Sequence, residues 1–518
     1  MRLKEDYMQL LDWISFGKVS AERDDNLSNY FFDNGVLNSV INEKSSFLVL
    51  GRKGAGKTAV FRYLRDNHVN VIGKDSILVP LSFEDYNWNI HSILTNTSKA
   101  ESMLYKQSWR FIILIESVKA YRAWFNARKT TVPKQIENAA KLLEKIFDSP
   151  IPTMSQIVGK KLLSLSGLKL PGGGLDLESG SLDSVSVHAG EISFDQVQQD
   201  KDLRGHLSEN IENLIRLLDQ ALTHSISSLP TIYICFDRVD EAWDDVSYET
   251  SKKVIAGLVS ASDSISAQYN GTIRPIVFLR EDIFDVLSIN DANKLREDCG
   301  ALLHWTRTSL VNLILKRVNY FAQNNQLPIT TDIDSLFDKL EMRQRAKPMN
   351  YLLRRTMMRP RDLIALLSRT IDSMREKAED PFAEEVKEFT KIECDYIYAA
   401  EPGYSEWLKQ EILDEWLVQK PEISELLNAI QNQGSTNISS VTLTQELIKL
   451  DSNYDSQSTI GHLRFLFDNS IIGFKIGAST EWKFKCFYPS QGFVESDEYR
   501  IHDGLVRALN LTETRERD

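Results

Sequence analysis

Short apolar runs alternate with helix-like patterns in the first three hundred residues. Four of these runs predict strands, at 46–50, 77–83, 231–236 and 273–279. Pro80 places the second strand at a sheet edge, because proline cannot donate a hydrogen bond to a neighbouring strand. The segments between the strands repeat apolar residues at helical spacing, at 57–65, 101–127, 134–148 and 207–224. Strands that alternate with helices predict an α/β fold with a mostly parallel sheet.

The pattern becomes helical after residue 307, and 308–403 is predicted to be a helical lid domain. Beyond Pro402-Gly403, helical patterns recur near 422–432, 441–450 and 457–468. An alternating segment at 471–488 then predicts a hairpin with Gly477 at its turn. Helices followed by a hairpin favour a winged-helix-like C-terminal domain over 404–518.

The remaining segments complete the expected domain organisation. Residues 1–45 form an N-terminal entry segment, and 46–307 form the core. A large helical insertion interrupts this core at about 85–228. Its Gly- and Ser-rich stretch at 165–190 predicts a loop or a small hairpin.

Composition places the chain among ordinary globular proteins. Of its 518 residues, 42% are hydrophobic and 26% charged, and the net charge of −12 argues against a general nucleic-acid binder. No apolar run approaches the roughly 18 residues that would span a bilayer. The four cysteines lack CxxC spacing, which fits a reducing compartment. We therefore expect a cytoplasmic protein without membrane contact.

The first predicted strand leads into a phosphate-binding motif. Gly51-Arg52-Lys53-Gly54-Ala55-Gly56-Lys57-Thr58 matches GxxxxGK[ST], with Ala59 following in the predicted helix. The glycines allow backbone N–H groups to surround an anion, and the helix N-terminus adds its dipole. Lys57 is expected to reach the β- and γ-phosphates of ATP, and the Thr58 hydroxyl to bind Mg²⁺.

An acidic motif follows the third predicted strand. Asp237, at the strand's carboxyl end, is well placed to hold the magnesium shell. A carboxylate three or four residues further on can orient the attacking water. Asp240 and Glu241 both meet this condition, and the longer side chain favours Glu241. The alternative is an acidic loop that caps the next helix.

Together these motifs resemble the bacterial P-loop ATPases of the STAND and Orc/Cdc6-like AAA+ assemblage. The resemblance also includes Phe278-Leu279-Arg280-Glu281-Asp282-Ile283-Phe284 and Arg359-Pro360-Arg361-Asp362-Leu363-Ile364. The segment Phe16-Gly17…Ala21-Glu22-Arg23-Asp24 is similar to one that covers the nucleotide base in a bacterial branch. The resemblance implies an ATP-hydrolysing molecular switch. Some bacterial members serve in antiviral defence or signalling.

The resemblance also assigns roles to arginines. Sensor 1 falls on Arg280, where most members have Asn or Thr, and sensor 2 falls on Arg359 or Arg361. Arg296 fits an arginine finger that a neighbouring subunit supplies, with Lys294 as second choice, so a homo-oligomer is implied. The alternative for each arginine is a structural salt bridge.

Two regions are candidates for further partners. Residues 101–145 carry nine basic and four acidic residues with interleaved aromatics, a composition that suits single-stranded nucleic acid. We favour the alternative, that these aromatics pack in the core. The segment 404–518 has 11 basic and 18 acidic residues, so protein contact or regulation by a separate effector is favoured there over DNA binding. The remaining hypotheses are a nucleic-acid-binding loader or clamp with weak ATPase activity, and a structural oligomer that holds ATP.

Overall fold

The computed structural model describes residues 9–83, 101–147, 201–242, 248–380, 387–450, 454–477, 479 and 481–512. By its contacts the chain divides into two units. We call Asp33–Arg52 with Lys57–Leu303 the α/β unit, and Met1–Phe32, Lys53–Gly56 and His304–Asp518 the helical unit. The predicted loop at 165–190 lies outside the described residues.

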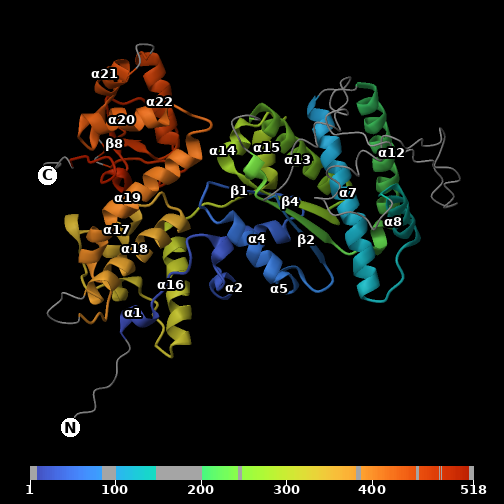
Figure 1. The fold of residues 1–518 in the computed structure, drawn as a ribbon, viewed down its shortest axis with the longest axis horizontal. Coiled ribbons are helices and arrows are strands. Elements are labelled where there is room, and N and C mark those ends of the chain that lie inside the picture. The colour runs from blue at the N-terminus through green and yellow to red at the C-terminus, as the bar shows by residue number, and fades with distance from the viewer. Residues whose placement is uncertain are drawn as a thin grey trace, which may run out of the picture. The chain divides into compact units, whose positions relative to one another are not determined.

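The α/β unit is built on a five-stranded parallel sheet with the order β2-β3-β4-β1-β5 (Figure 1). The strands are β1 (Leu48–Gly51), β2 (Ile77–Ser82), β3 (Ile232–Asp237), β4 (Ile273–Arg280) and β5 (Gly300–Leu302). Strands β1, β3 and β4 are fully buried, which explains their continuous apolar sequences. The predicted parallel α/β sheet is confirmed, and Pro80 lies in the edge strand β2. The three-residue β5 was not predicted, because it is too short to give a pattern.

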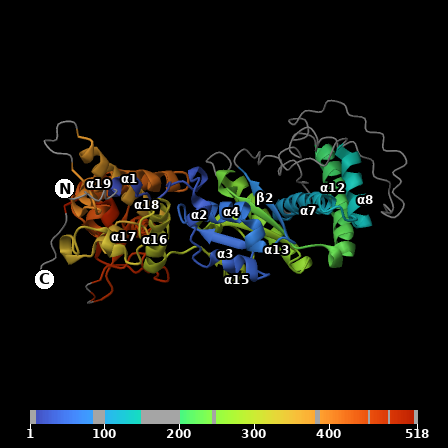
Figure 2. The ribbon, with the colours of Figure 1, turned by 90° about the horizontal axis from the view of Figure 1, so that it is seen from below.

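Helices surround this sheet. They are α3 (Val36–Asn42), α4 (Lys57–Asp66), α5 (His68–Ile72), α7 (Glu101–Ala127), α8 (Lys134–Phe147), α12 (Lys201–Ser225), α13 (Tyr248–Gln268), α14 (Glu281–Val286) and α15 (Ala292–Cys299). The insertion helices α7, α8 and α12 pack against one another, and α7 also packs on α13 (Figure 2). Their buried faces join the apolar core of the sheet.

The helical unit has its own apolar core. Its helices are α1 (Leu10–Trp13), α2 (Leu27–Tyr30), α16 (Arg307–Asn324), α17 (Pro348–Arg354), α18 (Pro360–Ala378), α19 (Cys394–Trp416), α20 (Ile423–Gln433), α21 (Ser440–Leu450) and α22 (Ser456–Asp468). The predicted boundary at 403/404 falls inside α19, which continues through Pro402. Among the described helices, none combines the length and apolar character needed to cross a membrane.

The C-terminal region carries a small antiparallel sheet with the order β6-β8-β7. Its strands are β6 (Asn437–Ser439), β7 (Ile472–Phe474) and β8 (Glu498–Ile501). Among the described residues of 471–488, the predicted hairpin is represented by a bridge between Phe474 and Lys483, with Gly477 at positive φ between them. The strand that pairs with β7 is β8. This pairing was not predicted, because the alternating pattern does not reveal which later segment pairs with β7.

Candidate functional site

The predicted phosphate-binding motif joins β1 to α4. Gly51 ends the strand and Lys57 begins the helix, so the expected strand–loop–helix arrangement is present. Gly54 and Gly56 have φ angles of +80° and +104°, a region that side chains with a Cβ rarely adopt. The loop therefore needs glycine at these positions, and its amides lead into a helix N-terminus suited to anions.

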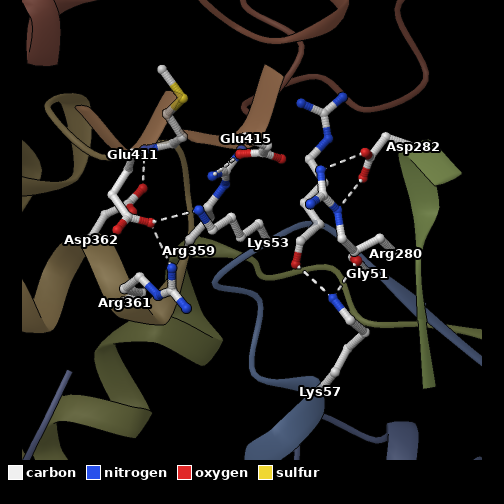
Figure 3. A network of polar contacts seen from close by, with 12 residues as sticks. Gly51, Lys53, Lys57, Arg280, Asp282, Arg359, Arg361, Asp362, Glu411 and Glu415 are labelled. Atoms are coloured by element: carbon white, nitrogen blue, oxygen red, sulfur yellow. Dashed lines mark hydrogen bonds and ion pairs between the residues drawn. The ribbon is translucent and has the colours of Figure 1, made fainter. Parts of the chain in front are cut away.

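Lys57 lies folded against its own loop. Its Nζ donates to the carbonyl oxygens of Gly51, at 2.8 Å, and Arg52, at 3.2 Å (Figure 3). Burial lowers the pKa of Lys57, and the nearby Asp240 opposes this change. The ammonium group is thus held by two neutral carbonyls, with a carboxylate close by. Its chemistry is that of a group able to bind phosphate.

The two predicted metal ligands are in contact with each other. Asp237 is the last residue of β3 and is 2% exposed, and its carboxylate accepts a hydrogen bond from the Thr58 hydroxyl. Burial and Asp240 raise the pKa of Asp237 to about 7, while Lys57 and Thr58 act in the opposite direction. A hydroxyl beside a carboxylate is an oxygen donor pair that suits Mg²⁺.

The topology of the sheet explains why these residues meet. The connection from β1 runs through α4 to β2 in one direction across the sheet, and the connection from β4 leads to β5 in the other. Right-handed crossovers therefore place the two connections on opposite faces. In open α/β sheets, ligands bind at the carboxyl ends of neighbouring strands whose connections leave to opposite faces. Gly51 and Arg280, which end β1 and β4, are register partners there.

The two candidates for positioning water differ in their surroundings. Both lie in the short turn Val239–Ala242, which follows Arg238 with its φ of +59°. Glu241 is exposed and pairs with the Arg238 Nη1 at 3.1 Å. Asp240 affects the pKa of both Lys57 and Asp237. The longer side chain favours Glu241, whereas these electrostatic effects favour Asp240.

Arg280 is buried at the strand ends and is held by its own chain. Its Nε and Nη2 donate to the two carboxylate oxygens of Asp282, at 3.2 and 2.7 Å (Figure 3). Arg280 also contributes to the lowered pKa of Lys57, so its charge reaches the predicted phosphate site. Asp282 belongs to the motif at 278–284, but the sequence assigns it no role. Its pairing with Arg280 depends on the turn after β4, which the sequence does not reveal.

Arg296, the predicted finger, makes intramolecular ion pairs. It lies on α15 and pairs with Asp285 and with Glu281, the latter at 3.8 Å. Its guanidinium also lies over the Phe284 ring. These contacts are those of the salt-bridge alternative, and action on a neighbouring subunit stays a prediction.

The two arginines predicted for the sensor 2 role face two carboxylates of α19. Arg359, which caps α18, bonds Glu415 at 3.0 Å, and Arg361 bonds Glu411 at 2.6 Å (Figure 3). The Glu411 carboxylate also lies 3.7 Å from the Lys53 Nζ, within the helical unit. Sequence reasoning missed both glutamates, although spacing of four residues on a helix places them on one face.

Trp305 is a second contact to the loop that sequence reasoning missed. Its indole Nε1–H donates to the Ala55 carbonyl at 2.8 Å. Ala55 itself is 4% exposed, so this part of the motif is anchored. Nothing in the apolar pattern distinguishes Trp305 from an ordinary core residue.

Most of the aromatic residues at 101–145 lie in the core of the α/β unit, whereas Trp124 is half-buried with Arg128 over its ring. Tyr105, Trp109 and Tyr121 are buried, and the Trp109 Nε1–H donates to the Val254 carbonyl. Arg110 pairs with Asp219, and Arg122 pairs with two glutamates of α8. Stacking on bases would require free ring faces. Core packing is confirmed for these buried rings, and nucleic-acid binding by 101–145 stays a prediction.

The basic residues of the C-terminal domain also lie against groups of their own chain. Arg464 lies over Phe493, and Lys475 lies over Trp482. Lys483 pairs with Glu481 and lies over Tyr488. DNA binding by this domain stays a prediction, and these pairings would compete with phosphate.

No group of three or more His, Cys, Asp or Glu that could hold a metal occurs in the part of the chain that the structure describes. Magnesium sites in nucleotide-binding proteins usually combine one or two protein ligands with phosphate oxygens and waters. Thr58 and Asp237 supply such a pair.

Comparison with known proteins gives two matches. Residues 308–413 match the family model described as the FunZ-associated C-terminal helical domain. Over 526 aligned residues the chain is 25% identical to the "Putative transposon gamma-delta 80.3 kDa protein" of Escherichia coli K12. That alignment covers 96% of this chain and 67% of the relative. The chain is thus a distant relative of a protein named for a transposon.

Proposed function

We propose that the protein is a Mg²⁺-dependent ATP-binding and ATP-hydrolysing molecular switch. The observation that carries this proposal is the meeting of Lys57, Thr58 and Asp237 at the carboxyl ends of β1 and β3. These residues come from two motifs almost 180 positions apart in the sequence. A chance glycine-rich turn would not require an acidic strand end beside it.

In the proposed reaction the motif's amides and Lys57 hold the β- and γ-phosphates. Mg²⁺, held by Thr58 and Asp237, would supply charge neutralisation at the phosphates. Asp240 or Glu241 orients the water that attacks the γ-phosphorus, and ADP is the leaving group. Arg280, which stays paired with Asp282, adds positive charge near the γ-phosphate.

The test is nucleotide binding and phosphate release by the full chain. Isothermal titration with ATP and Mg²⁺ should give saturable binding. Lys57→Ala should weaken it roughly 10- to 150-fold, the range expected for hydrogen bonds to a charged group. Asp237→Asn should remove its dependence on Mg²⁺. A folded wild-type chain that shows no affinity for Mg²⁺–ATP would contradict the proposal.

Hydrolysis is tested separately from binding. Asp240→Asn and Glu241→Gln should each keep ATP binding, and the one that positions water should abolish phosphate release. Saturable ATP binding by the wild-type chain without phosphate release would instead make the protein a passive ATP holder. If Arg296 acts on a neighbouring subunit, specific activity should fall as the protein is diluted.

The transposon relative supports a second candidate, an ATP-dependent loader or clamp that acts on nucleic acid. That relative aligns with almost the whole chain. Binding of DNA to the full chain should then weaken steeply as salt increases, because released counterions drive association. Salt-independent or absent binding would contradict this candidate and leave the ATPase proposal intact. A role in antiviral defence stays a prediction of the resemblance.

A further inference from the structure

Two acidic residues of α19 bind two arginines near the start of α18. Glu411 and Glu415 lie one helical turn apart, and they pair with Arg361 and Arg359 respectively (Figure 3). These are the two arginines to which the resemblance assigns the sensor 2 role. In the structure both are therefore occupied by carboxylates of their own unit.

The two pairs differ in their access to water. The side chains of Arg359 and Glu415 are 8% and 1% exposed, whereas those of Arg361 and Glu411 are 29% and 21% exposed. A buried pair resists exchange, because separating it leaves an uncompensated charge. A partly exposed pair is weaker and can exchange its partner. Arg359–Glu415 is thus an anchor, and Arg361–Glu411 is replaceable.

Glu411 also reaches the phosphate-binding motif. Its Oε2 lies 2.6 Å from the Arg361 Nη1 and 3.7 Å from the Lys53 Nζ. A Cβ placed on Gly54 would lie 3.2–3.3 Å from the Arg361 side chain. One carboxylate therefore neutralises two cations at the tip of the loop. Carboxylate and phosphate oxygens are recognised by the same donors.

We propose that Glu411 is an autoinhibitory competitor of the nucleotide's phosphates. Glu411 holds Arg361 and Lys53, and the phosphates must displace it to gain these donors. This inference rests on the proposed ATP-binding function. Such a competitor multiplies the association constant for the nucleotide by the fraction of chains in which the donors are free.

The direct test compares Glu411→Gln with the wild-type chain in titrations of N-methylanthraniloyl-ATP with Mg²⁺. The amide keeps the shape of the side chain and removes its charge, so the variant should bind roughly two- to tenfold more tightly. The matched control is Glu406→Gln, which changes a carboxylate on the same helix that pairs with Lys409. This control should bind as the wild type does.

A double-mutant cycle identifies the partner. In an Arg361→Ala background the gain from Glu411→Gln should shrink, because the main donor that Glu411 occupies is gone. Thermal unfolding of each variant verifies that it is folded, and Glu411→Ala serves if the glutamine variant is not.

The outcomes separate this inference from the proposed function. Wild-type binding that Lys57→Ala weakens, with no gain in a folded Glu411→Gln variant, overturns the competitor alone. Absence of binding in the wild type and in both Glu411 variants overturns both proposals. Binding in the Glu411→Gln variant but not in the wild type would support the competitor most strongly.

Discussion

The Thr58 hydroxyl donates a hydrogen bond to the Asp237 carboxylate at the buried end of β3. Burial and Asp240 raise the pKa of Asp237 to about 7, above its ordinary value of 3.8. The folded chain therefore binds this proton more tightly than the unfolded chain. Its contribution to the free energy of unfolding decreases as pH rises from about 4 to 7, and the full penalty remains at higher pH.

Asp237→Asn should therefore stabilise the nucleotide-free protein at pH 8, by about 1–3 kcal/mol. The gain should shrink towards pH 5, where the wild-type carboxyl is already protonated. Urea unfolding at several pH values measures the difference, with the exposed Asp25→Asn as control. An equal gain at pH 5 and pH 8 would show that Asp237 does not titrate in this window.

Binding of Mg²⁺–ATP should release a proton from the same carboxyl. A cation requires the ionised form, so binding draws the pKa of Asp237 down, and affinity should increase from pH 6 to pH 8. Calorimetric titrations in two buffers of different ionisation enthalpy measure the protons released near pH 7. The Asp237→Asn variant, with any residual binding, should lack this release. Identical heats in both buffers for the wild type would contradict the prediction.

The sequence predicted the elements that a local pattern determines. The strands β1, β3 and β4 are continuous apolar runs, because both faces of the sheet are covered there. The loop glycines were identified because phosphate binding restricts residue type as well as spacing. Asp237 was identified because it directly follows an apolar strand. Both kinds of signal are contained within a few neighbouring positions.

The contacts that were missed depend on long-range pairing. Glu411 and Arg361 lie 50 positions apart, and Trp305 and Ala55 lie 250 positions apart. In each pair, the residues that flank one member in the sequence do not reveal the other member. The pairing of β7 with β8 was missed for the same reason, because the chain returns only after a long irregular segment.

Arg122 holds the insertion helices together and should be sensitive to charge reversal. Its guanidinium pairs with Glu137 at 3.0 Å and with Glu144 at 2.7 Å, and both partners raise its pKa. Arg122→Glu would place three carboxylates together and should lower the free energy of unfolding by about 1–3 kcal/mol. Arg216→Glu is the control, because this exposed arginine of α12 bonds the neutral amide of Asn213.

Chemical denaturation measures that loss, and a parallel DNA titration separates the two interpretations of this surface. A structural Arg122 predicts lower stability with any DNA binding unchanged per folded molecule. Loss of DNA affinity without loss of stability would instead make this arginine a nucleic-acid contact.

Gly257 allows α13 to approach α7 closely. A Cβ at this position would lie 2.6 Å from the Tyr105 Cβ and 2.8 Å from its backbone carbon. Alanine gains about 1 kcal/mol over glycine inside a helix. Overpacking against a backbone that cannot rotate away costs about 1–3 kcal/mol, occasionally more, so the clash should win.

Gly257→Ala should therefore lower the free energy of unfolding by up to about 2 kcal/mol. Gly461→Ala provides a matched control in α22, because nothing lies within 4 Å of the added Cβ. There the helix propensity acts alone, and the variant should be more stable by about 0.5–1 kcal/mol. Urea unfolding of both variants measures the two signs. Stabilisation by Gly257→Ala would mean that α7 can move away from α13, and that the close approach of these helices does not hold the insertion on the sheet.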